Sequence, residues 1–349
     1  MTEQNEHEEE CSRCCKLLHI FKQERVKCEH DPCPDSSDAH YFCYDCNLYL
    51  CHGCKVNQIG THRVFKIPYA DVLNDKPYKI IDCNQSIGEP WGIAFSTNGM
   101  WALADCSNHC VYLFDAQDNL FNKFGKKGEG HGEFQHPEGL AFDKYNYLYV
   151  VDNCNSRVQK FAGDGTYILC FGDKVLDHPN GIMIFDELVY VADTGNSRIA
   201  VFNIGGQNCT TFGTEHLCKP FDVAVNTTKR ELLVPDYEQR CIYRFTIDGH
   251  YVGLLDLNLE GTRTIQLSFP YSVTTYSNAI TSYIILADTW NHRILILDDK
   301  GKCVDSFGSN GADQGQFNCP CWVAISPSSK LYVSDRYNKR IQIFNKLDV

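Results

Sequence analysis

Short apolar runs separated by polar turns fill the chain from about residue 78 onward. The runs hold four or five residues, are rich in β-branched and aromatic side chains, and are bounded by Gly, Asn and Asp. One stretch contains four such runs, namely Gly181–Phe185, Leu188–Ala192, Ile199–Phe202 and Cys209–Phe212, with the polar segment Asp193–Arg198 between the second and the third. This composition predicts β-strands, so the stretch predicts a small antiparallel sheet.

The same pattern occurs six times. In each copy a Pro precedes the first strand and an Asp ends the second. These residues are Pro90, Pro137, Pro179, Pro220, Pro270 and Pro320, and Asp105, Asp152, Asp193, Asp236, Asp288 and Asp335. Successive Asp residues are 41 to 52 residues apart. A period of this length built from strands is typical of radial repetition with one four-stranded sheet per repeat. The sequence therefore predicts an all-β, six-bladed β-propeller.

The sixth copy has three strands and no fourth. The run Tyr78–Cys83, before the first copy, has the composition of the missing strand. A strand from this position would close the ring and cover an exposed sheet edge. We therefore expect the propeller to span residues 78–349 and to be closed by residues 78–83. The Gly-rich segments Gly125–Phe134 and Gly308–Phe317 share one spacing at the same place in two repeats, which indicates blade connectors rather than phosphate-binding loops.

The turn after the second strand carries the motif Asp-x-x-Asn-x-Arg. It is complete at Asp152–Arg157 and Asp193–Arg198, and close versions begin at Asp288 and Asp335. This recurring motif resembles the NHL repeat, which implies an NHL-type propeller over residues 78–349. Because a feature present in most blades indicates architecture, we expect each Asp to accept hydrogen bonds from its own turn. Each Arg is expected to pair with a neighbouring blade.

The first 77 residues differ in composition, since nine of the 20 cysteines fall between Cys11 and Cys54. The candidate metal ligands are Cys28, His30, Cys33, Cys43, Cys46, Cys51, Cys54 and His62. Cys pairs two residues apart, followed by a His, supply the thiolates and imidazole that tetrahedral Zn²⁺ requires. A segment this short buries little apolar surface, so zinc binding would supply its folding free energy.

The stretch Ala39–Cys54, followed by His62, resembles a B-box zinc finger. The resemblance implies one or two zinc ions held in cross-braced fashion. Cys28, with His30 or Cys33, would share one ion with Cys51 and Cys54, and Cys43, Cys46 and His62 would share the second, with His40 or His52 as a possible further ligand. The expected domains are an acidic, disordered tail with extra cysteines over residues 1–27, the finger over 28–67, a linker over 68–77 and the propeller.

An alternative is a RING finger, the module that recruits ubiquitin-conjugating enzymes. Cys11 and Cys14, followed by Cys28, His30 and Cys33, resemble its first half, although Ser36 stands where the next ligand belongs. A B-box followed by NHL repeats resembles the NHL branch of the tripartite-motif family. The segment before the propeller is too short for that family's coiled coil, so the oligomeric state stays open. Participation in ubiquitin ligation is the alternative function.

Candidate partner-binding residues gather on the face that bears the Asp-x-x-Asn-x-Arg turns. They are Trp91, Phe221, Tyr237, Arg240, Tyr271, Trp290, Arg293, Trp322, Arg336 and Tyr337. Aromatic and Arg side chains suit both protein hot spots and the stacking of single-stranded RNA bases, and the resemblance includes RNA-binding repressors that use this face. Residues 78–349 hold 23 Lys and Arg against 31 Asp and Glu, a net charge of −8, which favours a protein partner.

The residues directly after each Pro are Trp91, Glu138, Asn180, Phe221, Tyr271 and Cys321. This mostly apolar set offers few ligands for a catalytic metal, so we expect a binding protein rather than an enzyme. The chain has no apolar stretch near 18 residues and no signal peptide, which predicts no membrane partner. Zinc-type cysteine usage indicates a reducing compartment. The sequence thus predicts a zinc-binding adaptor of the cytoplasm, or of the nucleus.

Overall fold

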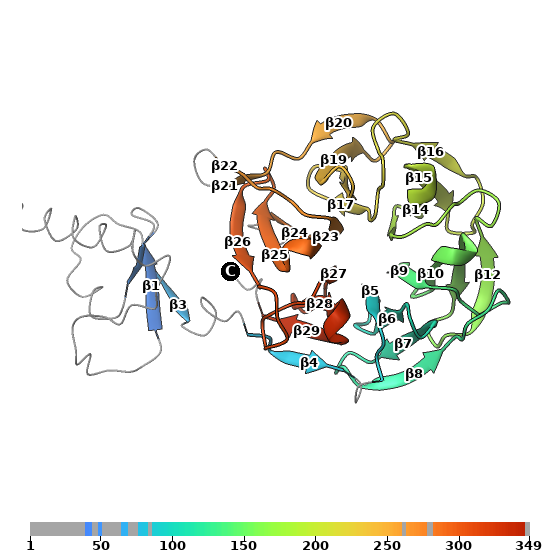
Figure 1. Cartoon of the computed structure of the whole chain (residues 1–349), viewed down its shortest axis with the longest axis horizontal. Coiled ribbons are helices and arrows are strands. Elements are labelled where there is room, and N and C mark those ends of the chain that lie inside the picture. Colours follow the sequence, from blue (N-terminus) through green and yellow to red (C-terminus); the bar gives the residue numbers. More distant parts are fainter. Residues whose placement is uncertain are drawn as a thin grey trace, which may run out of the picture. The chain divides into compact units, whose positions relative to one another are not determined.

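The fold is described from a computed structural model of the chain (Figure 1). The structure describes residues 39–43, 48–50, 64–68, 76–82, 86–259, 263–277 and 282–345. The chain divides into two compact units, Met1–Leu73 and Asn74–Val349.

The described part of the first unit is a three-stranded antiparallel sheet. Its strands are β1 (Ala39–Cys43), β2 (Leu48–Leu50) and β3 (Val64–Pro68), in the order β2-β1-β3. In the central strand, Phe42 lies opposite both Tyr49 and Phe65. Among the predicted zinc ligands, Cys43 ends β1, and Cys28, His30, Cys33, Cys46, Cys51, Cys54 and His62 lie outside the described residues. Zinc binding therefore stays a prediction.

The second unit is a ring of six four-stranded antiparallel sheets, which confirms the predicted six-bladed propeller (Figure 1). From the innermost strand outward, the blades are β5 (Pro90–Phe95), β6 (Trp101–Asp105), β7 (Cys110–Phe114) and β8 (Leu120–Phe124); β9 (Pro137–Phe142), β10 (Leu148–Asp152), β11 (Arg157–Phe161) and β12 (Tyr167–Phe171); β13 (Ile182–Phe185), β14 (Leu188–Asp193), β15 (Arg198–Asn203) and β16 (Thr210–Phe212); β17 (Ala224–Asn226), β18 (Glu231–Asp236), β19 (Cys241–Thr246) and β20 (Tyr251–Leu254); β23 (Pro270–Ser277), β24 (Ser282–Asp288), β25 (Arg293–Asp298) and β26 (Cys303–Phe307); and β27 (Pro320–Ile325), β28 (Leu331–Asp335), β29 (Arg340–Phe344) and β4 (Lys79–Ile81).

The longest interval between Asp residues, from Asp236 to Asp288, has a structural cause. An additional hairpin, β21 (Asn258–Leu259) paired with β22 (Arg263–Thr264), stands between the fourth and fifth blades. The insertion lengthens the connection and leaves the blade itself with four strands.

Pro and Asp keep the same step along the chain because they face each other across the two innermost strands of a blade. Pro90 lies opposite Asp105, and Pro320 lies opposite Asp335. The register shifts directly after each of these Pro residues, as expected where Pro cannot donate to the strand ladder. The Pro and Asp therefore mark one face of the ring, here called the turn face.

Short 3₁₀ turns connect the second and third strands in four blades. They are η1 (Asn153–Asn155), η2 (Thr194–Asn196), η3 (Thr289–Asn291) and η4 (Arg336–Asn338). Each turn ends at a residue in the left-handed conformation, such as Ser156 with φ of 52°. The turns give the four motif copies the same backbone shape.

A Phe pair joins neighbouring blades at four of the six boundaries. A Phe at the end of one blade's outermost strand packs against a Phe in the third strand of the next blade. The pairs are Phe124–Phe161, Phe171–Phe202, Phe212–Phe245 and Phe307–Phe344, with ring centroids 4.9 to 5.2 Å apart. Aromatic pairs at this spacing contribute packing beyond their buried area, so the core consists largely of the contacts between blades.

Strand β4 is the outermost strand of the sixth blade. It pairs with β29, where Ile80 lies opposite Gln342, and the Tyr78 N–H donates to the Ile343 carbonyl at 2.6 Å. The ring is thus closed by a segment that precedes the first blade in sequence (Figure 1).

The carboxylate of Asp118 joins the closing strand to the first and last blades. It accepts hydrogen bonds from Trp101 Nε1 at 3.1 Å, Tyr332 Oη at 2.7 Å and Lys79 Nζ at 3.0 Å. The three donors come from blade one, blade six and β4, so one side chain links both ends of the ring.

Within the described residues, no helix has the length and apolar character needed to cross a membrane.

Candidate functional site

The repeated Asp residues of the turn face are fully buried and organise their own turns. Asp152 accepts hydrogen bonds from the Gln135 N–H at 2.7 Å, from Asn155 Nδ2 at 2.9 Å and from Arg157 Nε at 2.8 Å. Burial raises the pKa of this carboxyl, and these donors counteract the shift. The structural role predicted for the Asp residues agrees with this geometry.

The expectation that each motif Arg pairs with a neighbouring blade is wrong. Arg157, Arg198, Arg293 and Arg340 each form an ion pair with the Asp of their own repeat, at 2.7 to 2.8 Å. Their remaining guanidinium nitrogens donate to carbonyls of the connector that enters the same blade, as Arg157 does to Gly130 and Glu133. The short spacing from Asp to Arg folds both side chains over one turn, which makes the Asp the nearest acceptor.

The copies that begin at Asp288 and Asp335 are complete motifs rather than close versions. Arg293 Nε and Arg340 Nε both donate to their Asp Oδ2 at 2.7 Å. Blades one and four have Cys110 and Cys241 at the Arg position, and Asp105 and Asp236 there accept backbone N–H groups instead.

The residues directly after each Pro converge on the propeller axis. Trp91, Phe221 and Tyr271 form one apolar side, with the Phe221 and Tyr271 rings stacked at 4.2 Å and Trp91 about 6 Å from both. Blades one and four lie on opposite sides of the ring, so the contact between Trp91 and Phe221 spans the axis. Trp91 and Phe221 are buried, and they serve as the floor of the turn face rather than as a free stacking platform.

The other side of this floor is polar. Asn180 Nδ2 donates a short hydrogen bond to Glu138 Oε2, and both side chains are buried. Burial raises the pKa of Glu138 to about 8, so the carboxyl is largely neutral at physiological pH. No group of three or more His, Cys, Asp or Glu side chains within the described residues is arranged to hold a metal ion.

Arg336 covers Trp91. Its guanidinium lies 4.3 Å from the Trp91 ring centroid and 4.7 Å from that of Tyr337. The same group donates to Glu89 Oε2 from Nε at 2.9 Å and from Nη2 at 2.7 Å. The positive charge is therefore neutralised by a carboxylate from blade one, while Tyr337 stays 48% exposed.

A second aromatic line crosses the turn face over blades four and five. Tyr237, Phe269 and Trp290 are neighbours at centroid distances of 6.0 and 5.4 Å. The exposed Arg240 lies over the Phe269 ring at 5.2 Å and forms no ion pair with another described residue. Trp290 is 55% exposed, which is unusual for so large an apolar side chain. This line is the most accessible aromatic surface of the turn face.

Phe269 is missing from the sequence-predicted set. It directly precedes Pro270 and adopts a left-handed conformation, with φ of 51°. His136, His178 and Cys319 precede Pro in other repeats and share this conformation, so the residue before the Pro is a recurrent turn-face position. The signal was available in the sequence as the position before each Pro.

Trp322 was predicted on the turn face, and the structure places it elsewhere. Cys321 is the residue that directly follows Pro320, and Trp322 comes one position later, where it lines a cavity along the axis. Successive side chains of a strand point to opposite sides, so a shift by one residue moves the indole away from the turn face.

Comparison with known proteins supports the repeat assignment. The NHL repeat model matches residues 134–161 and 176–202. Protein brain tumor of Drosophila melanogaster is 29% identical over 120 residues, which is 32% of this chain and 12% of that protein. A probable peptidyl-alpha-hydroxyglycine alpha-amidating lyase of Caenorhabditis elegans is 26% identical over 157 residues, which is 38% of this chain and 45% of the lyase. The chain thus spans less than half the length of either relative.

Solved structures agree on the fold. A gluconolactonase from Xanthomonas campestris superimposes with a TM-score of 0.60 at 12% identity, over 78% of this chain and 91% of that one. At this identity the likeness shows the fold alone. Residues 78–345 thus form a six-bladed propeller that contains NHL repeats.

Proposed function

We propose that the turn face of this NHL-repeat propeller is a protein-recognition surface and that the chain acts as an adaptor in the cytoplasm or nucleus. The supporting observation is the exposed aromatic line of Tyr237, Phe269 and Trp290, flanked by Arg240. Trp, Tyr and Arg at the centre of a surface are the residue types that dominate protein hot spots.

The electrostatics of the turn face favour a protein over a nucleic acid. Arg293 is paired with Asp288, and Arg336 is paired with Glu89. Binding of a phosphate backbone depends on cations that are free to replace counterions. Two of the three predicted Arg contacts therefore supply geometry and packing, and little net positive charge.

We expect the substitution Trp290→Ala to weaken peptide binding by the turn face at least tenfold, because hot-spot truncation costs about 2 kcal/mol or more. The measurement is selection of peptides from a random display library on the full chain, followed by fluorescence anisotropy of the selected peptides. Tyr337→Ala should weaken the same peptides.

The matched control is Tyr145→Ala, since Tyr145 is 56% exposed in the hairpin between β9 and β10, on the other face of the ring. Peptides that lose affinity equally for the Tyr145 and Trp290 variants would exclude the turn face as their site.

Single-stranded RNA is the second candidate partner, and Arg240 over Phe269 beside Trp290 is the arrangement that favours it. An aromatic platform beside a free guanidinium can stack a base and contact its phosphate. Anisotropy with a random pool of short RNA at two salt concentrations tests this. Salt-sensitive binding that is lost in Arg240→Gln would identify RNA as the partner, and its absence would leave the protein surface.

We also propose that the cysteine-rich segment binds one or two zinc ions through the ligands predicted above, on the support of their spacing. We expect the purified full chain to release one to two equivalents of zinc when its thiols are titrated with a mercurial, read with a metallochromic dye. Cys51→Ser together with Cys54→Ser should lower the stoichiometry, whereas Cys303→Ser, in strand β26 of the propeller, should not. Zinc-free protein from a zinc-supplemented preparation would contradict the proposal.

A further inference from the structure

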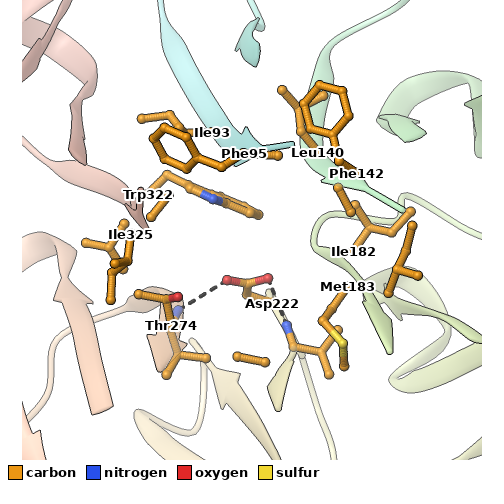
Figure 2. Close-up of a pocket in the computed structure, with 18 residues that line it drawn as sticks. Ile93, Phe95, Leu140, Phe142, Ile182, Met183, Asp222, Thr274, Trp322 and Ile325 are labelled. Carbon is orange, nitrogen blue, oxygen red and sulfur yellow. Dashed lines mark hydrogen bonds between the residues drawn. The ribbon is translucent and has the colours of Figure 1, made fainter. Parts of the chain in front are cut away.

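A cavity of about 240 Å³ lies along the propeller axis, on the side away from the turn face (Figure 2). All six blades contribute to it through the later residues of their innermost segments, among them Phe95, Phe142, Ile184 and Ile325. These four side chains are partly exposed, whereas residues nearer the Pro ends are buried, so the cavity opens towards the face opposite the turn face. It exceeds the apolar cavity of about 150 Å³ that suffices to bind benzene.

Asp222 is the one ionisable side chain among the residues that line this cavity. It is 3% exposed, and no cationic side chain in the described part of the chain pairs with it. Figure 2 shows its carboxyl group pointing into the space bounded by the apolar side chains. An ionisable group with a perturbed environment in an apolar pocket is a typical mark of a binding site.

The hydrogen bonds of Asp222 leave room for one further donor. Oδ1 accepts the Val223 N–H at 2.8 Å, and Oδ2 accepts Ser272 Oγ at 2.9 Å and the Val273 N–H at 3.2 Å. A carboxylate has about four acceptor positions, so one on Oδ1 stays open. Gly181 allows the carboxyl this position, because a Cβ there would lie 2.5 Å from Oδ1.

The indole of Trp322 extends across the same space (Figure 2). Its neighbours along the cavity wall include Ile93 and Leu140, which are apolar and buried. A cation held against Asp222 would therefore meet an aromatic ring and aliphatic groups, and Trp is the side chain that interacts best with a cation.

We propose that this axial cavity binds a primary alkylammonium group, with the cation at Asp222 and the alkyl chain among the apolar wall residues. A single open acceptor suits the compact ammonium ion, whereas a guanidinium binds best to two free oxygens. The two sources of this chemistry are a small aliphatic amine and the side chain of a lysine on a partner protein. The site is separate from the turn face and does not depend on its function.

Burial raises the pKa of Asp222 to about 7, and a bound cation would favour the charged carboxylate. Binding of an ammonium ion is therefore expected to strengthen as the pH rises from 6 to 8. No other residue that lines the cavity titrates in this range, since the remaining ones are not ionisable.

The test is a titration of the ¹⁵N-labelled full chain with n-butylammonium chloride, followed by the indole N–H signals of its four Trp residues. We expect the Trp322 signal, assigned by its loss in Trp322→Phe, to shift in a saturable manner while the exposed Trp290 signal stays in place. A parallel titration with Nα-acetyl-lysine-N-methylamide separates the sources. Binding of the lysine derivative indicates a lysine side chain, and binding of the amine alone indicates a small amine.

Two variants and one neutral ligand complete the test. Asp222→Asn should weaken binding at least tenfold, and n-butanol should bind at least tenfold more weakly than the amine. Thr274→Phe fills the cavity rim without touching Asp222 and should also abolish the shift, which covers the case in which the Asn variant fails to fold. No saturable Trp322 shift, or equal shifts with n-butanol, would overturn the proposal.

Discussion

A propeller that begins at residue 83, and so lacks strand β4, is expected to be at least about 4 kcal/mol less stable than one that begins at Asn74. The shorter chain loses the pairing of Lys79–Ile81 with β29 and the burial of Ile81. It also loses the contact of Lys79 with Asp118, which ties the first and last blades together. Without β4, the strand β29 becomes an unpaired edge in the centre of a sheet that was built to be covered.

The measurement is the urea midpoint of both proteins, followed by tryptophan fluorescence and by circular dichroism. The two proteins differ by nine residues, 74–82, and both lack the cysteine-rich segment, so the comparison isolates the closing strand. Equal midpoints would mean that three strands suffice for the sixth blade and that the ring does not depend on β4. Self-association of the shorter protein through the open edge would agree with the expected role.

The substitution Asp152→Ala is expected to lower the free energy of unfolding by about 3 to 5 kcal/mol, because it leaves a buried cation without its partner. Arg157 is buried and forms its ion pair with Asp152 at 2.8 Å. The change also removes the acceptor for the Gln135 N–H and for Gln159 Nε2. The full chain can be measured by urea denaturation with the variant and wild type side by side.

Two controls separate charge from turn geometry. Asp105→Ala removes the equivalent carboxylate from a blade that has Cys110 instead of Arg, so it should cost clearly less than Asp152→Ala. Asp164→Ala, in an exposed hairpin of the same blade as Asp152, should leave the midpoint nearly unchanged. Equal losses for Asp105 and Asp152 would show that the ion pair is not the main contribution.

The periodic residues carried most of the fold in the sequence. Pro and Asp recur at one step because Pro90 and Asp105, like Pro320 and Asp335, lie opposite each other in the sheet. That pairing is local, within two adjacent strands, and a local constraint leaves a regular trace in the sequence. The strands of the third blade lie within one or two residues of the predicted ranges for the same reason.

The candidate site was predicted less completely. The ten-residue set included Trp290 and Tyr337, which are exposed on the turn face, together with Trp91 and Phe221, which are buried at the axis. It omitted Phe269, because attention fell on residues after each Pro rather than before it. Exposure depends on which neighbouring blade covers a side chain, and periodicity within one repeat does not contain that information.

By itself, the sequence determined the number of blades, the strands of each blade, the buried Asp residues and the presence of NHL repeats, because these depend on contacts repeated at short range in every copy. Only the tertiary structure decided that Arg336 is paired with Glu89, that Trp322 lines the axis and that Asp222 faces an apolar cavity. These three features involve single residues from blades far apart in the chain. They arise when the ring closes and brings six different innermost segments around one axis.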